Sequence, residues 1–295
     1  MKIFSKIKDQ EDVGTIIILV VAVFWGMFPI LVNKGSQHFQ PLFFGATSII
    51  TGGFTALLLS LLKKDLHNIF NRKALPWAIG VAIFTSTLSY GLMFIGSKLT
   101  SGINTSALML SEIIFTILIT PFFGEKTTLN KVLGGFLVLI GALIILFKGG
   151  ELNLGDFIVI LCTVFLPFGN HFGKKALEHI SPENLLALRY LFSGTFLLLM
   201  SFIFEDPGKM LPSLVNFWPY VALNGILFLG LINTLWYKGL KRLPISKAVF
   251  LLMTYPIFSL IFLVLFYNEI PNSFQVIGIF VIVAGAYFSS KITKK

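Results

Sequence analysis

The sequence has 295 residues, of which 56% are hydrophobic and only 12% are charged. Soluble domains contain roughly a quarter charged residues, so this composition excludes a soluble globular protein. The single cysteine, Cys162, excludes an intramolecular disulfide and a cysteine-based metal cluster. The net charge of +10 is spread over short polar segments between apolar runs, so no nucleic-acid partner is expected.

Hydropathy and helix-breaking residues predict ten membrane-spanning helices, each near the roughly 20 residues that cross a bilayer. In chain order, the predicted helices cover residues 13–33, 41–62, 75–96, 102–122, 129–147, 155–175, 183–204, 217–238, 245–267 and 273–290. Short linkers leave no room for a soluble domain beside the bundle. The predicted fold class is therefore an all-α membrane protein embedded in a lipid bilayer.

The distribution of basic residues predicts the orientation of these helices. Most lysines and arginines fall at the two ends of the chain and in alternate linkers, whereas the other linkers contain only Lys34, Lys98, Lys148 and Lys209. Cytoplasmic loops retain positive charge, so both termini are predicted to be cytoplasmic. We expect a multi-pass protein of the cytoplasmic membrane.

The two halves of the chain resemble each other at an offset of 144 residues, which aligns residues 99–142 with 243–286. The identical positions include Glu125 and Glu269, Gly134 and Gly278, and Gly141 and Gly285. This similarity predicts two five-helix repeats, residues 1–148 and 149–295. Because each repeat has an odd number of spans, the second is inverted in the membrane, as in many secondary transporters.

Three prolines lie well within predicted spans, namely Pro29, Pro167 and Pro256. Each removes a backbone hydrogen bond from its helix and frees a carbonyl four residues earlier. Broken helices at corresponding positions of two repeats are typical of a transport site, so these prolines are predicted hinges. The alternative is a set of packing kinks that never contact substrate.

Glu112 is the only acidic residue in the interior of a predicted span, because the other acids fall at span ends or in linkers. A carboxyl group at this depth costs free energy unless it faces a polar cavity or is protonated. Glu112 is therefore predicted to couple transport to protons or to bind a cation, with His171 as a second coupling candidate. The alternative is a neutral acid that only bonds to a neighbouring helix.

Aromatic and polar side chains within the spans are predicted to line one central cavity with Glu112. The predicted substrate-binding residues are Trp25, Phe28, Tyr90, Glu112, Asn170, Asn233, Trp236, Tyr237 and Tyr255. Any one of them can instead serve as an interhelical contact. Arg189 lies about two turns from Pro182 and is predicted to anchor its helix at the cytoplasmic surface, with a gate or an anion contact as the alternatives.

The glycines paired seven residues apart predict smooth faces on the fifth and tenth helices. These faces can pack against each other within one chain or form a dimer seam, so either a monomer or a homodimer is expected. The spans contain no paired acids, metal-ligand spacing, nucleophile elbow or phosphate-binding loop. An enzyme is therefore not expected, and neither is a cofactor.

Several of these features together resemble the EamA-type branch of the drug/metabolite transporter superfamily. The resemblance rests on the two five-helix repeats, Trp25-Gly26, Pro182 with Arg189, and Pro256 followed by Glu269, Gly278 and Gly285. It implies a secondary carrier, commonly an exporter of amino acids or other small metabolites, with a cavity between the halves. Two positions depart from the pattern between repeats: Ser48 stands in place of Arg189, and Glu112 in place of Pro256.

The aromatic cavity with one carboxyl suits an amphipathic amino acid or metabolite as the small-molecule substrate. An organic cation bound by ring faces and Glu112 is the alternative. A membrane protein without transport activity is the alternative from a different functional class.

Overall fold

The computed structural model describes residues 2–148, 153–267 and 270–290, and this part of the chain is almost entirely helical, without a β-strand. The first half contains α1 (Lys2–Trp25), α2 (Phe28–Ser36), α3 (Pro41–Leu62), η1 (Leu66–Asn68), α4 (Leu75–Val81), η2 (Ala82–Ser89), α5 (Tyr90–Leu99), α6 (Gly102–Leu108), η3 (Met109–Ser111), α7 (Glu112–Ile119), η4 (Thr120–Phe123) and α8 (Leu129–Lys148). The second half contains α9 (Leu154–Val164), α10 (Leu166–Ala176), α11 (Pro182–Phe204), α12 (Pro207–Ala222), η5 (Leu223–Ile232), α13 (Asn233–Leu240), α14 (Ile245–Leu252), α15 (Tyr255–Tyr267) and α16 (Ser273–Ser290). The segments η2 and η5 are π-helical, and the other η segments are 3₁₀-helical.

Eight stretches of the described chain are long and apolar enough to cross a membrane. The fifth and tenth predicted spans correspond to α8 and α16, whose apolar stretches are shorter, so the count of ten spans stays a prediction. The segment between the seventh and eighth predicted spans was expected to be a linker. This segment is instead helical from Pro207, where α12 begins. Proline is favoured at the start of a helix, and the Asp206 side chain caps this helix by accepting a hydrogen bond from the Gly208 amide.

Each predicted proline hinge lies at an interruption between two helices. Pro29 follows the break between α1 and α2, Pro167 the break between α9 and α10, and Pro256 the break between α14 and α15. A fourth interruption was not predicted: the 3₁₀ turn η3 separates α6 from α7 directly before Glu112. No proline lies at this turn, so hydropathy and helix-breaking residues do not predict the interruption.

Two π-helical segments occur at matching places in the two halves. The third predicted span contains η2 and the eighth contains η5. Such segments are rare and often lie at functional sites, because the wider turn leaves backbone groups incompletely bonded and turns side chains to new directions. Hydropathy carries no signal for this change, so the sequence analysis missed both.

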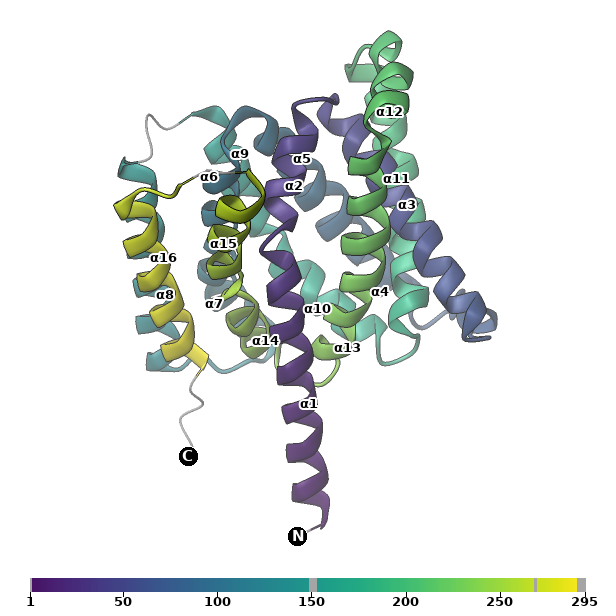
Figure 1. Cartoon of the computed structure of the whole chain (residues 1–295). Coiled ribbons are helices and arrows are strands. Elements are labelled where there is room, and N and C mark those ends of the chain that lie inside the picture. The colour runs from purple at the N-terminus through teal and green to yellow at the C-terminus, as the bar shows by residue number, and fades with distance from the viewer. Residues whose placement is uncertain (1, 149–152, 268–269, 291–295) are drawn as a thin grey trace.

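The glycine faces pack within the chain, where α8 lies along α16 (Figure 1). A Cβ atom added to Gly141 would lie 2.5 Å from the carbonyl oxygen of Gly278, and one added to Gly285 would lie 2.6 Å from that of Gly134. Backbone atoms cannot move aside as flexible side chains can. This contact confirms the intramolecular alternative for the glycine faces.

We expect Gly141→Ala to separate α8 from α16 and to lower the stability of the protein by roughly 1–3 kcal/mol, as overpacking does in a dense core. The matched control is Gly91→Ala, because an added Cβ there meets only a flexible leucine side-chain end at 3.3 Å. Thermal unfolding of the purified variants measures the difference. Equal melting temperatures would contradict the close helix contact.

Glu125 holds the start of a helix that is distant in sequence. Its carboxylate accepts hydrogen bonds from the amides of Ile245 (2.7 Å) and Ser246 (3.2 Å), at the beginning of α14. The carboxylate of Glu205 likewise accepts bonds from Leu42 and Phe43 at the beginning of α3. Each acid satisfies amides that a helix leaves unpaired at its N-terminus.

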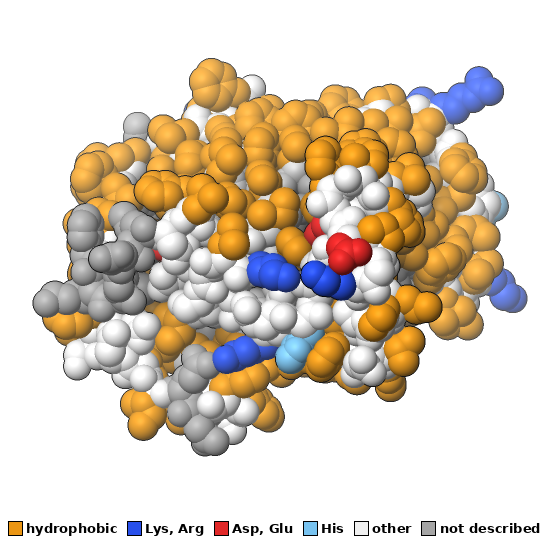
Figure 2. All heavy atoms as spheres, turned by 90° about the horizontal axis from the view of Figure 1, so that it is seen from above, with side chains coloured by type: hydrophobic (Ala, Val, Ile, Leu, Met, Phe, Trp, Pro, Cys, Tyr) orange, Lys and Arg blue, Asp and Glu red, His pale blue; other side chains and the backbone are white. Residues whose placement is uncertain are grey.

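The start of α1 and the end of α16 lie on the same side of the bundle (Figure 1). Viewed from the opposite side, the periphery is covered by hydrophobic side chains, and polar atoms with a few charged groups gather nearer the middle (Figure 2). Exposed leucine, isoleucine and phenylalanine side chains on the outside of the helices suit a lipid environment.

Candidate functional site

A small cavity lies among the interrupted helices and the π-helical segments. Its lining residues are Trp25, Thr85, Tyr90, Met109, Glu112, Leu166, Asn170, Arg189, Asn233, Trp236, Tyr237 and Leu252. The free volume is about 30 Å³, close to the space that one water molecule occupies. The conformation described here is therefore contracted around the cavity.

The fold brings most of the predicted binding residues to this cavity, and the following line it: Trp25, Tyr90, Glu112, Asn170, Asn233, Trp236 and Tyr237. Phe28 lies behind the wall, where its ring packs against Trp25 and Tyr90 with centroids 4.7 and 6.4 Å apart. Tyr255 also lies outside the lining, and its hydroxyl donates to the carbonyl of Ser106 at 2.6 Å. Both side chains are buried supports of the helices around the cavity.

His171 lies away from the cavity, although it follows Asn170 in the sequence. Adjacent residues on a helix point about 100° apart, so only Asn170 faces inward. The His171 ring instead stacks on Phe123 with centroids 3.9 Å apart and meets Trp77 edge to face. This aromatic packing removes His171 from the residues that face the cavity.

Glu112 is 5% exposed and begins α7 directly after the 3₁₀ turn η3. The side-chain amide of Asn170 on α10 donates to Glu112 Oε1 at 3.0 Å. This contact joins the interrupted fourth and sixth predicted spans at the cavity. The two predicted site residues therefore form one unit, with the carboxyl held by a single neutral partner among the described residues.

Arg189 differs from the expected surface anchor, because its side chain is only 2% exposed and lines the cavity. Its guanidinium donates to the hydroxyls of Tyr237 and Tyr190, each at 2.6 Å. It also lies over the rings of Tyr190, Tyr237 and Tyr90, with centroid distances of 4.3, 5.0 and 5.8 Å. Distance from the helix end suggested snorkelling, but the inward-facing side of α11 directs the side chain into the bundle.

Asn233 ties this tyrosine cluster together from the first residue of α13. Its side-chain amide donates to the hydroxyl of Tyr190 at 2.8 Å and to that of Tyr90 at 3.3 Å. Asn233 follows the π-helical segment η5 directly. The arginine, the tyrosines and the asparagine thus form a buried polar cluster from three separate spans.

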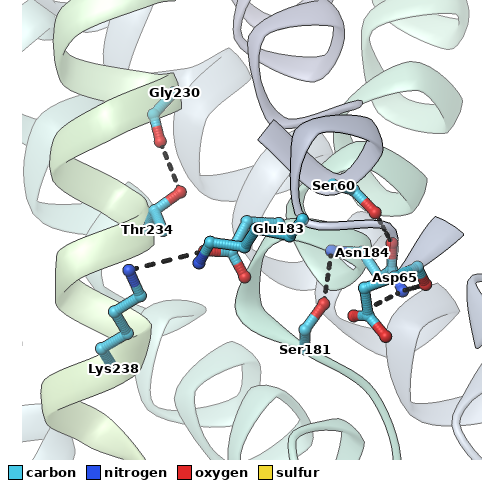
Figure 3. A network of polar contacts seen from close by, with 9 residues as sticks. Ser60, Asp65, Ser181, Glu183, Asn184, Gly230, Thr234 and Lys238 are labelled. Atoms are coloured by element: carbon cyan, nitrogen blue, oxygen red, sulfur yellow. Dashed lines mark hydrogen bonds and ion pairs between the residues drawn. The ribbon is translucent and has the colours of Figure 1, made fainter. Parts of the chain in front are cut away.

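On the side where α1 begins, Glu183 connects three helices below the cavity. Glu183, near the start of α11, pairs with Lys63 after the end of α3 and with Lys238 on α13, the latter at 3.5 Å. Figure 3 shows Glu183 reaching toward Lys238, with Asn184 beside it contacting Ser60 and Asp65. Partial burial lowers the pKa of Lys63, but the hydrogen bond and charge of Glu183 outweigh it and raise that pKa, so Lys63 stays charged at neutral pH.

The opposite side of the bundle is held by a second set of polar contacts. The amide of Asn33 on α2 donates to the carbonyls of Ser97 and Thr100 at 2.6 and 2.8 Å. Thr100 donates to Asp156 at the start of α9. Polar contacts therefore join helices on both sides of the contracted cavity.

The family model described as "EamA-like transporter family" matches this chain twice, over residues 12–147 and 153–291. The chain belongs to the EamA-like transporter family. It is therefore a multi-pass membrane protein of a transporter family, as the resemblance in the sequence indicated.

Two proteins named as a transporter and an efflux pump, and one solved structure, are similar over nearly the whole chain. "Uncharacterized transporter YoaV" of Bacillus subtilis is 26% identical over 92% of this chain and 95% of its own length. "Probable amino-acid metabolite efflux pump" of Salmonella typhimurium is 22% identical over 92% of each chain. A solved structure titled "Crystal structure of protein" superposes with a TM-score of 0.72 at 20% identity, over 94% of this chain and 96% of that one, which supports the fold.

The cavity also contains residues that the sequence analysis did not place there: Thr85, Met109, Leu166, Arg189 and Leu252. Thr85 lies within η2, and Met109 begins η3, so both belong to irregular helical segments. Leu166 and Leu252 flank proline breaks that had been predicted. Positions next to a predicted break were the available signal for these two residues.

Proposed function

We propose that this protein is a secondary active transporter that exports amino acids or other small amphipathic metabolites across the cytoplasmic membrane. The observation that carries the proposal is the cavity where interrupted helices meet, lined by aromatic rings, Glu112 and Arg189. Such a cavity can recognise a small molecule with an apolar part and charged groups. The efflux-pump name of the Salmonella relative supports the same direction and substrate class.

The proposed mechanism is alternating access between two inverted five-helix repeats, residues 1–148 and 149–295. Support comes from the repeated family match and from irregularities at paired positions: proline breaks in the first and sixth predicted spans, and π-helices in the third and eighth. The repeat boundary at residues 149–152 lies outside the described residues. In this mechanism the halves rock about the breaks at Pro29, Pro167 and Pro256.

Glu112 supplies the coupling in this proposal. Protonation removes its negative charge, so a proton and a positively charged substrate group compete for the same carboxylate. A proton entering from outside can then displace substrate and drive exchange in opposite directions. The bond to Asn170 keeps the carboxyl at the junction of two interrupted spans, where helix movement can change its access.

An organic-cation exporter is the second candidate function. The aromatic lining and Glu112 favour it, but the guanidinium of Arg189 in the same cavity opposes it by like-charge repulsion.

We also propose a monomer as the transporting unit, because the glycine faces of α8 and α16 are occupied within the chain.

Comparing metabolites in the spent medium of cells with and without the protein tests the export function. We expect one or a few amino acids, or compounds derived from them, to accumulate outside cells that express it. Uptake of organic cations such as tetraphenylphosphonium into inverted vesicles, with no amino-acid export, would instead favour the second candidate.

The proposed topology predicts opposite labelling of two surface positions. Cysteine in place of Lys73, between the second and third spans, should react with an impermeant reagent only after the membrane is opened. Cysteine in place of Lys209, near the start of α12, should react in intact cells. The native Cys162 is buried and serves as the unlabelled background. Labelling of both positions in intact cells would contradict the topology.

A further inference from the structure

Arg189 is a cation without an acidic partner in a place where burial makes an isolated charge costly. Its side chain is 2% exposed, and among the described residues none of the ion pairs includes it. The tyrosine hydroxyls and rings that surround it are neutral. The positive charge of Arg189 is therefore stabilised only by neutral polar and aromatic groups among the described residues.

Two N–H donors at the cavity, one of them on Arg189, have no hydrogen-bond partner. Arg189 Nε and Trp25 Nε1 are both buried without a hydrogen-bond partner, and both residues line the cavity. The hydroxyl oxygen of Tyr190 already accepts from Arg189 and Asn233, which occupies both of its lone pairs. This side of the cavity therefore has N–H donors without partners, and a carboxylate supplies several acceptors for them.

The one acidic residue of the lining, Glu112, is on the same cavity but bonds to Asn170 and lies beyond ion-pair distance from Arg189. The cavity thus contains one basic and one acidic side chain that are not paired with each other. A molecule with a carboxylate and an ammonium group can contact both at once. A free α-amino acid has these two charged groups attached to the same carbon atom.

We propose that Arg189 is the carboxylate-binding residue of the substrate site, and that it pairs with Glu112 as the ammonium-binding residue to select zwitterionic α-amino acids. This inference rests on the proposed carrier function and deepens it. When the halves move apart and the cavity widens, Arg189 exchanges its tyrosine hydroxyls for the substrate carboxylate. The tyrosines hold the guanidinium in place while the site is empty.

The test uses the purified protein in proteoliposomes and substrate counterflow. The twenty standard amino acids are screened first, and the best of them is compared with its carboxamide and its decarboxylated amine. We expect the amino acid to bind about tenfold or more tightly than either analogue, since hydrogen bonds to a charged group are lost. Arg189→Lys should weaken binding of the amino acid by a similar factor and leave the carboxamide little changed. The control is Lys241→Gln, which removes an exposed positive charge outside the cavity.

The outcomes separate this inference from the export function. If amino acids are transported but the carboxamide competes equally well in the wild-type protein, the role of Arg189 is overturned and the carrier function stands. If no amino acid shows counterflow and tetraphenylphosphonium does, both are overturned. The binding of the amino acid and its analogues is compared in the wild-type protein. This comparison tests the inference even if the Arg189 variant folds poorly.

Discussion

Replacing Glu112 by glutamine is expected to abolish accumulation of substrate against a gradient while downhill exchange continues. Glutamine keeps nearly the same shape and can still bond to Asn170, so the helix junction remains intact. It cannot bind and release a proton, so the transport cycle loses its dependence on the proton gradient. Transport in proteoliposomes with and without an imposed pH difference measures the effect.

The control for this experiment is Glu178→Gln, which removes an exposed acid that pairs with Lys175. It should retain transport driven by the pH gradient. In Glu112→Gln, substrate exchange should become independent of pH across the range in which the wild type responds. Wild-type accumulation by Glu112→Gln would make this residue structural and leave facilitated diffusion as the simpler mechanism.

Replacing Glu183 by glutamine is expected to open the side of the bundle on which α1 begins. The carboxylate is 2% exposed and pairs with Lys63 and Lys238, which are 48% and 34% exposed. Its loss leaves two lysines beside each other without the shared acid between them. Because both lysines reach solvent, we expect the free energy of unfolding to fall by about 1–3 kcal/mol, which lies between the values for exposed and buried ion pairs.

Two measurements follow this change in Glu183→Gln. Its melting temperature should fall by several degrees, and a cysteine placed at Thr85 in the cavity should react faster with a thiol reagent added from that side. The matched control is again Glu178→Gln. It removes an exposed ion pair with Lys175, which lies only three residues away and so does not connect separate helices. Unchanged reactivity at Thr85 would show that the Glu183 contacts do not close the cavity.

The sequence by itself determined the class of protein and most of the cavity. Apolar runs and basic linkers indicated a membrane bundle, because a bilayer accepts only long apolar helices. Polar side chains such as Glu112 and Asn170 were identifiable because their presence within apolar spans is costly without a purpose. The proline breaks were visible for a similar reason, since proline cannot complete the helix hydrogen bonds.

Only the tertiary structure decided where Arg189 and His171 point. Both lie near span ends in the sequence, where exposure was a reasonable expectation. The direction of each side chain is set largely by neighbouring helices. Arg189 contacts Tyr90 and Tyr237 of two other spans as well as Tyr190 on its own helix, and His171 contacts Phe123 and Trp77. The π-helical segments and the turn before Glu112 also depend on contacts between helices, because local hydropathy is the same in a regular α-helix and in these irregular turns.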